Sequence, residues 1–217
     1  MYINIHSHHP QQPGEWAIRS LYRDFEESAA PGNYSIGLHP WYIHNENWKR
    51  DFELLKRFSE NTNVLAIGEC GLDKACSTAY HLQEAVFIAQ LLWANENGKP
   101  LIIHCVRAYE EILNLLKKHK NRVPVLFHGF NKNSTLAGRI ISEGHWLSFG
   151  KALFSPDMRN VFSNVPSEKI FLESDDATIS IKSLYEQAAE IKKISLDKLS
   201  LQLEKNVQTV FNRLAVN

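Results

Sequence analysis

The chain has 217 residues, of which 44% are hydrophobic and 22% are charged. These values suit one globular domain, or two small ones, with a real hydrophobic core, and they exclude a disordered chain. The 24 Lys and Arg residues balance the 24 Asp and Glu residues, so the total charge shows none of the strongly basic field that marks many nucleic-acid-binding proteins.

The three cysteines, Cys70, Cys76 and Cys105, have neither zinc-ribbon spacing nor the pattern of a disulfide framework. Reduced thiols are typical of cytoplasmic proteins. No basic region followed by an apolar stretch opens the chain, and no apolar run is long enough to span a bilayer. We therefore expect a cytoplasmic protein that does not enter a membrane.

The first predicted element is a short strand that carries paired histidines. The stretch INIHSHHP, residues 3–10, alternates so that Asn4, His6 and His8 share one face of a strand. Two imidazoles side by side at a strand end can bind one metal ion, or they can simply form a polar strand end. We do not expect a fragment of a purification tag, because this stretch holds only three histidines and Ser7 interrupts them.

Further strands and helices alternate along the rest of the chain. We predict strands at 16–23, 33–40, 64–69, 100–105, 123–128, 145–150 and 169–174. We predict helices at 47–60, 80–98, 108–120, 134–144, 155–165, 181–194 and 195–216. Gly98 is suited to end the long second helix, and Asn133 or Ser134 to cap the fourth.

Eight strands, mostly followed by helices, predict a parallel sheet and a TIM-type (β/α)8 barrel. The segment between His8 and Tyr34 has room for a strand but hardly for two crossover helices, and residues 25–33 read as a loop. We therefore expect a barrel trimmed or distorted in its first two βα units. An open doubly wound sheet is the alternative, although no Gly-rich phosphate loop follows any strand.

Imidazoles and carboxylates follow most of the apolar strands. The polar positions at the predicted strand ends are His6, His8, His39, Glu69, His104, His128 and Glu173 to Asp176. Each alone has an ordinary explanation, such as a hydrogen-bonded rim histidine or a helix N-cap. Together they would meet at the C-terminal ends of the strands, where βα barrels carry their active sites. A mixed nitrogen and oxygen cluster of this size suits two divalent metals.

The same residues lie in motifs that resemble those of the TatD-type deoxyribonucleases, metal-dependent hydrolases of the amidohydrolase-like barrel class. The matching stretches run almost from end to end: HSH at 6–8, GLHPW at 37–41, AIGECGLD at 66–73, QEAVFIAQLLWA at 83–94, KPLIIHC at 99–105, FHGF at 127–130, LSFG at 147–150, LESDDA at 172–177 and EKNVQTVF at 204–211. Single motifs are weak, but their order and spacing are specific. The resemblance implies one TatD-like hydrolase domain over residues 1–217.

The resemblance also implies a two-metal site. His6 and His8 would bind one ion, and Asp175 would complete that site and act as the general base. His104 and His128 would bind the second ion, and Glu69 would bridge the two. Histidine-rich ligation suits Zn, Mn, Fe or Co better than Mg. The activity expected from the family is phosphodiester hydrolysis, often the 3′-to-5′ removal of nucleotides from single-stranded DNA or RNA.

Four further residues receive expectations from their positions in these motifs. His39, Trp41 and Arg107 are expected to line the substrate site, Trp41 as a rim residue or as a stacking platform for a base. Arg107 could meet a phosphate, or simply start its helix. Asp73 is expected to orient the turn after Glu69. The partner would be single-stranded DNA or RNA, or a small phosphodiester or ester, and we expect a monomer.

Three features depart from the family pattern. Asn4 stands where an Asp usually precedes the paired histidines, which would weaken the first metal site. The segment 11–33 and the loop 177–183 are short, which would open the substrate groove. Two alternatives therefore stay open: a metal-dependent hydrolase of another ester, lactone or amide, and a degenerate metal-binding relative without turnover.

Overall fold

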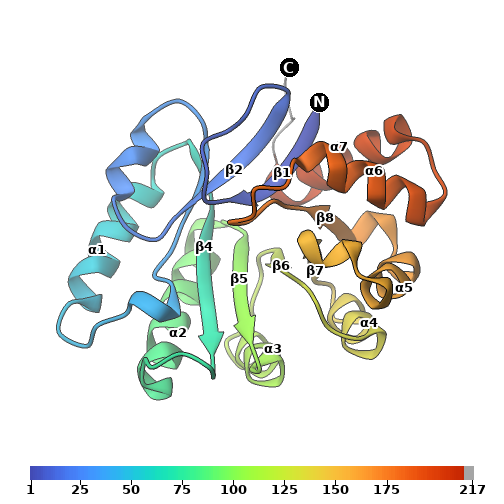
Figure 1. The fold of residues 1–217 in the computed structure, drawn as a ribbon. Helices are drawn as coiled ribbons and strands as arrows, with labels where there is room; N and C mark the ends of the chain where they lie inside the picture. The colour runs from blue at the N-terminus through green and yellow to red at the C-terminus, as the bar shows by residue number, and fades with distance from the viewer. Residues whose placement is uncertain (213–217) are drawn as a thin grey trace. The chain divides into compact units, whose positions relative to one another are not determined.

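A computed structural model describes residues 1–212 of the chain (Figure 1). The strands are β1 Tyr2–Ser7, β2 Glu15–Leu21, β3 Asn33–Ile36, β4 Val64–Asp73, β5 Leu101–Val106, β6 Val125–Phe127, β7 Trp146–Phe149 and β8 Ile170–Leu172. The α-helices are α1 Trp48–Ser59, α2 Tyr80–Asn97, α3 Tyr109–Lys118, α4 Ser134–Ser142, α5 Pro156–Asn164, α6 Ile181–Lys192 and α7 Leu196–Phe211. All eight predicted strands and all seven predicted helices are present, although the predicted end of the last helix, 213–216, lies outside the described residues.

The strands follow one another in the sheet in their chain order, β1 to β8. The pairs β1–β2, β3–β4, β4–β5, β6–β7 and β7–β8 are all parallel. This is the order expected of a (β/α)8 fold. The chain divides into two compact units, which are described separately. Unit 1 comprises Met1–Arg19 and the chain from Leu126 onward, and unit 2 comprises Ser20–Val125.

In unit 1, the last strand lies beside the first. Ser7 at the end of β1 forms a parallel bridge with Asp175, three residues after β8. Helix α6 packs against β1, where the buried Tyr185 hydroxyl accepts a hydrogen bond from the Ile3 backbone N–H at 2.8 Å. Asn206 of α7 donates to the carbonyl of Ile170 at the start of β8. A sheet whose last strand meets its first is what closure of a barrel requires.

In unit 2, β4 pairs with β3 on one side and β5 on the other. Strand β4 is four residues longer than predicted, because it continues through Glu69 to Asp73, and the expectation that it ends at Glu69 is wrong. All ten of its residues are buried, so no alternation of polar and apolar residues marks its end. The register against β5 shifts between Ile67 and Cys70, which places Glu69 at an irregularity inside the strand.

The first two βα units are trimmed, as predicted. Residues 8–14 form an irregular connection between β1 and β2, and a 3₁₀ turn, Phe25–Ala29, stands between β2 and β3 where a loop was expected. Neither connection among these residues contains an α-helix. With 25 residues between His8 and Tyr34, the chain is too short for two strands and two crossover helices.

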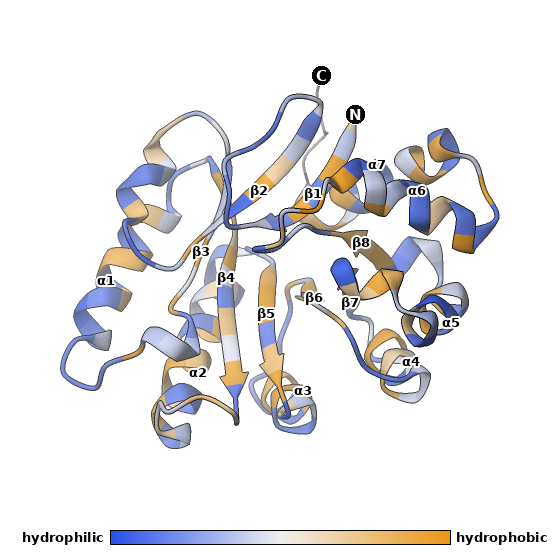
Figure 2. Ribbon diagram, in the orientation of Figure 1, coloured by the Kyte–Doolittle hydropathy of each residue, from blue (hydrophilic) through white to orange (hydrophobic). Residues whose placement is uncertain are grey.

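Hydropathy follows the burial of the elements. Figure 2 shows β8 as largely hydrophobic, and its three residues are fully buried. The helices α1 and α4 in the same view mix hydrophilic and hydrophobic residues, as expected of helices that cover a sheet on one side. Within residues 1–212, no helix combines the length and the apolar character needed to cross a membrane.

Candidate functional site

The two histidines of β1 converge with a carboxylate in unit 1. The Nε2 atoms of His6 and His8 each lie 3.5 Å from Oδ1 of Asp175. His6 is fully buried, whereas the side chains of His8 and Asp175 are 27% and 35% exposed, so the group is open to solvent on one side. Two imidazole nitrogens and one carboxylate oxygen around a common point form a donor set suited to a divalent transition metal.

Backbone hydrogen bonds fix this convergence. The Asp175 N–H donates to the His6 carbonyl at 3.0 Å, and the His8 N–H donates to the Asp175 carbonyl at 3.2 Å. Asp175 itself has a left-handed backbone, with φ of 55°, which few residue types adopt outside Gly, Asn and Asp. The three side chains are therefore positioned by the main chain and not only by their own rotamers.

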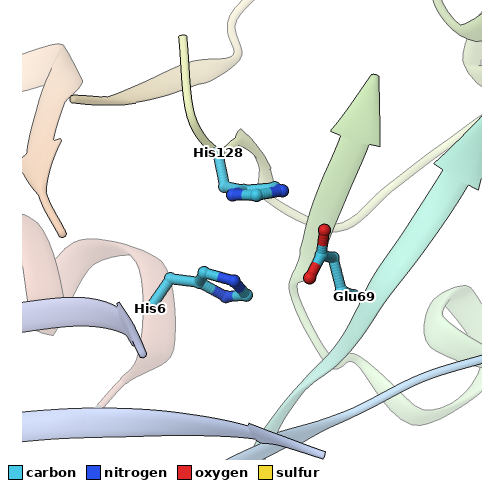
Figure 3. A group of neighbouring side chains, drawn as sticks. All are labelled: His6, Glu69 and His128. Atoms are coloured by element: carbon cyan, nitrogen blue, oxygen red, sulfur yellow. The ribbon is translucent and has the colours of Figure 1, made fainter. Parts of the chain in front are cut away.

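His128, directly after β6, brings a third imidazole to the same unit. Its ring centroid lies 4.4 Å from that of His6, and Figure 3 shows the two side chains next to each other. The same view also draws Glu69, which belongs to unit 2. His128 Nδ1 lies 3.4 Å from Oε1 of Glu173, a fully buried carboxylate that also accepts from the Gly129 N–H at 2.7 Å.

Glu173 was not predicted as a site residue, although it was noted among the acidic residues after β8. Its contact with His128 and its burial make it an outer partner of a candidate ligand, because a buried carboxylate near an imidazole nitrogen orients the ring. The signal in the sequence was the group of three acids in LESDD, which does not reveal which acid points inward.

Asn4, the departure from the family motif, connects β1 to the segment after β8. Its side-chain oxygen accepts from the Ser174 N–H at 3.0 Å, and its Nδ2 donates to the Ser174 hydroxyl at 2.9 Å. The same Nδ2 lies 3.4 Å from Oε2 of Glu15. Asn4 therefore supports the loop that carries Asp175, through the residue just before it.

In unit 2, Glu69 lies between two histidines. Its Oε1 is 2.8 Å from Nδ1 of His104, on β5, and 3.1 Å from Nε2 of His39, which follows β3. All three side chains are buried. The structure therefore brings Glu69 and His104 together, as predicted, and adds His39 to this group.

Asp73 contacts a candidate ligand directly. Its Oδ2 is 3.1 Å from Nε2 of His104 and accepts from the Trp41 indole N–H at 2.6 Å, while its Oδ1 accepts from the Ala75 N–H at 2.7 Å. Burial by itself would raise the pKa of Asp73, but the hydrogen bonds from Trp41, His104 and Ala75 lower it below its ordinary value. The contact with Ala75 agrees with the expected role in the turn; the contact with His104 was not anticipated.

Two glycines permit the close packing around Glu69. A Cβ on Gly37 would lie 2.5 Å from the carbonyl oxygen of Glu69, and a Cβ on Gly71 would lie 1.9 Å from that of His104. No residue with a side chain fits at such distances without moving the backbone. Gln83 of α2 accepts from the Asp73 N–H at 2.8 Å and so fixes the end of β4.

Two of the remaining predicted residues, Trp41 and Arg107, lie at the surface. Trp41 is 53% exposed, and Arg107 is exposed with a left-handed φ of 54° directly after β5. His39 is buried except on one side, where it borders a cavity of about 360 Å³ within unit 2 that Tyr42 and Trp48 also line. Cys70 is fully buried, and burial raises the pKa of its thiol, which argues against a ligand role.

The family follows from comparison with known proteins. The family model described as TatD related DNase matches residues 21–212. The chain belongs to the TatD family of metal-dependent hydrolases. An uncharacterized metal-dependent hydrolase of Buchnera aphidicola is 29% identical over 196 residues, which cover 82% of this chain and 73% of the relative. The 3′-5′ ssDNA/RNA exonuclease TatD of Edwardsiella piscicida is 33% identical over 149 residues, which cover 65% of this chain and 56% of the relative.

A solved structure confirms the fold. The crystal structure of YJJV, a TatD homologue from Escherichia coli K12, matches 98% of this chain and 98% of its own with a TM-score of 0.84, at 21% sequence identity. The predicted (β/α)8 barrel of the TatD family is therefore confirmed, and the open doubly wound alternative is wrong.

Proposed function

We propose that this TatD family member is a two-metal phosphodiesterase that removes nucleotides from the 3′ end of single-stranded DNA or RNA. The observation that carries the proposal is the convergence of His6, His8 and Asp175 at the end of β1, which forms a donor set suited to a divalent metal. Membership of the TatD family supports it, as does the printed activity of the Edwardsiella relative. We propose that the whole chain acts as one such domain and as a monomer.

The ligand assignment extends the family pattern to this chain. We assign His6, His8 and Asp175 to the first divalent metal, and His104 and His128 to the second. Glu69 is the proposed bridge between them. The imidazole-rich set favours Zn, Mn, Fe or Co, while Mg in excess would serve less well. Each assigned residue keeps the side chain that the chemistry requires, so none of the six ligands has been lost.

In the proposed hydrolysis, the bound metals and the protein side chains have different roles. Bound metals lower the pKa of a coordinated water and stabilise the charge on the phosphoryl group. Asp175 is the proposed general base, because its carboxylate is one-third exposed and can accept a proton from solvent at the site. Glu69 is buried and would contribute as a ligand and not as a base. Protons compete with metals for the imidazoles, so activity should fall in acid.

The substrate contacts are proposed for the exposed residues near these groups. Trp41 presents a ring that is half exposed, on which an unpaired base can stack. Arg107 directly follows β5, the strand of His104, and its guanidinium can pair with a phosphate. His39 remains a proposed lining residue only through the cavity that it borders. We place the protein in the cytoplasm, since its three cysteines are all free thiols.

The test is hydrolysis of 3′-labelled single-stranded DNA by metal-stripped protein with Mn, Zn or Mg restored. Wild type should release label only with metal, and Glu69→Ala and Asp175→Asn should lose at least about 100-fold in rate. Asp176→Asn is the matched control, because Asp176 is the neighbouring carboxylate but is 71% exposed and pairs only loosely with Lys151 at 3.9 Å. Asn tolerates the left-handed backbone of Asp175, so that variant should fold normally.

Three outcomes are informative. Metal-dependent release that persists in the control and disappears in both site variants supports the proposal. Binding of about two metals per chain without release from DNA or RNA overturns the nuclease assignment and favours another ester, lactone or amide as substrate. Equal rates in wild type and Asp175→Asn overturn the assignment of the general base.

A further inference from the structure

Trp41 makes hydrogen bonds to both outer partners of the Glu69–His104 pair. Its backbone N–H donates to Nδ1 of His39 at 3.1 Å, and its indole N–H donates to Oδ2 of Asp73 at 2.6 Å. His39 lies against Glu69, and Asp73 lies against His104. One residue in the turn after β3 thus contacts both neighbours of the pair.

The first contact fixes the tautomer of His39. A backbone N–H can only donate, so Nδ1 of His39 must present its lone pair to Trp41. The proton of the neutral ring is then on Nε2, which lies 3.1 Å from Glu69 Oε1 and donates to it. His39 in this state offers no lone pair to a metal at Nε2. Its role is to hold the Glu69 carboxylate in place.

The second contact fixes the tautomer of His104. The Trp41 indole N–H and the Ala75 N–H both donate to the Asp73 carboxyl group, and such donors favour its ionised form. An ionised carboxylate has no proton to donate, so Nε2 of His104 must be the donor in its contact with Asp73, and Nε2 therefore carries a proton. In the neutral form of the ring, which is the form that ligates a metal, the lone pair is then on Nδ1, on the side of Glu69.

This arrangement places two acceptors against each other. The Nδ1 lone pair of His104 and Glu69 Oε1 are 2.8 Å apart, and two acceptors at this distance are stable only when they share a proton or a cation. A metal ion accepts both lone pairs at once, and a ligating histidine commonly donates its other N–H to a carboxylate. The donor set of unit 2 therefore fits a divalent metal through Glu69 and His104 and not through His39.

We propose that Trp41, through Asp73 and His39, is the positioning residue that sets the proton positions of this group, so that His104 Nδ1 and the Glu69 carboxylate face one metal together. The inference deepens the proposed function, because it concerns the same metal site. It assigns His39 and Asp73 to orientation and not to ligation. It also gives Trp41 a role that does not depend on stacking with substrate.

The experiment measures tautomers and metal affinity in the full chain. Long-range proton–nitrogen spectra of Zn²⁺-loaded, ¹⁵N-histidine-labelled protein should show His39 and His104 protonated at Nε2, with Nδ1 of His104 unprotonated. Chelator-competition titration with Zn²⁺ should show about 10- to 100-fold weaker binding for Asp73→Asn, because the amide cannot accept from Trp41, His104 and Ala75 at once. Trp41→Phe, which removes only the indole donor, should weaken binding about 5-fold.

Trp93→Phe is the matched control. It removes an indole hydrogen bond of similar length, from Trp93 to the Ser59 hydroxyl at 2.8 Å, in the same unit but on α2. Its Zn²⁺ affinity and histidine spectra should equal those of wild type. Trp41 is half exposed, so Trp41→Phe should fold even if Asp73→Asn does not.

The outcomes separate this inference from the proposed function. A His104 protonated at Nδ1 in the Zn²⁺-loaded protein, or Zn²⁺ binding by Trp41→Phe that is as tight as in wild type, overturns the positioning role. Wild type that binds Zn²⁺ with the expected tautomers and yet hydrolyses no nucleic acid overturns the proposed substrate and leaves this inference supported. A wild-type chain without Zn²⁺ affinity overturns both.

Discussion

Asn4 offers a direct test of how the segment carrying Asp175 is held. Its side chain is buried and makes two hydrogen bonds to Ser174, one to the backbone N–H and one to the hydroxyl. Ser174 is itself buried and immediately precedes Asp175. A change at Asn4 therefore acts on the proposed first metal site through the stability of the fold and the position of the loop that carries Asp175.

Asn4→Ala should cost about 2–4 kcal/mol of unfolding free energy. The Ser174 N–H would lose its acceptor, and an unsatisfied buried donor costs about 1–3 kcal/mol. Loss of the second bond, to the Ser174 hydroxyl, adds about 1 kcal/mol, since the hydroxyl can rotate toward another partner.

Asn4→Asp, the residue usual in the family, should keep both bonds to Ser174, because a carboxylate can accept from the N–H and from the hydroxyl. It would, however, place a carboxylate about 3.4 Å from that of Glu15, where Nδ2 now lies. Two carboxylates at this distance repel, at a cost of about 1–3 kcal/mol after the partial exposure of Glu15 is taken into account. Adding Glu15→Gln should remove that cost.

The assay is urea unfolding of the three variants between pH 5 and pH 8. Repulsion raises the pKa of the new carboxyl in the folded state, so the folded chain binds a proton more readily than the unfolded chain. The cost of Asn4→Asp should therefore be largest at pH 8 and shrink as the pH falls. A variant as stable as wild type at pH 8, or a cost that Glu15→Gln does not relieve, would refute the reasoning.

Further outcomes follow from other contacts. Gly71→Ala should lower the free energy of unfolding, measured with urea, by about 3 kcal/mol or more, because its Cβ would lie 1.9 Å from the His104 carbonyl oxygen. Gly138→Ala, in open space within α4, should raise it by up to about 1 kcal/mol. Equal effects of the two variants would contradict this. Lys192→Met should lower the free energy of unfolding by about 1–3 kcal/mol in the same assay, because the Lys192 ammonium donates to carbonyls at the end of α5. An unchanged urea midpoint would count against that role. The pKa of Asp73 is lowered in the folded chain, so its contribution to stability is present at neutral pH and is lost as the pH falls through the folded pKa. The free energy of unfolding of Asp73→Asn, measured from pH 7 into acid, should lack this loss. A pH profile of stability like that of wild type would contradict the prediction.

Local patterns were sufficient to predict the elements of the fold. The helix α2 ends at Gly98, whose φ of 63° is the left-handed C-cap expected there, and α4 is capped by the Asn133 side chain. The trimmed start of the barrel followed from chain length alone. Hydrophobic periodicity and caps depend on residues within a few positions of one another, which is why the sequence reports them directly.

Predictions failed where the determining contact was not local. The end of β4 was misplaced because both faces of the strand are buried and its polar Glu69 lies inside it, at a register shift set by β5. Glu173 was passed over because three acids within four positions give no sign of which one is buried. Asp73 was assigned to a turn, which is correct for Oδ1, while the contact of Oδ2 with His104 depends on a strand about thirty residues further along the chain.

The sequence by itself determined the family, the order of strands and helices, and the histidines and carboxylates available as ligands, since these depend on residue types and their spacing. Only the tertiary structure decided the roles within that set. His39 and His104 are chemically identical side chains, and both lie beside Glu69. The N–H of Trp41 faces one ring and the carboxylate of Asp73 faces the other, and these neighbours place the protons. Proton positions follow from hydrogen-bond partners in three dimensions, which no spacing along the chain specifies.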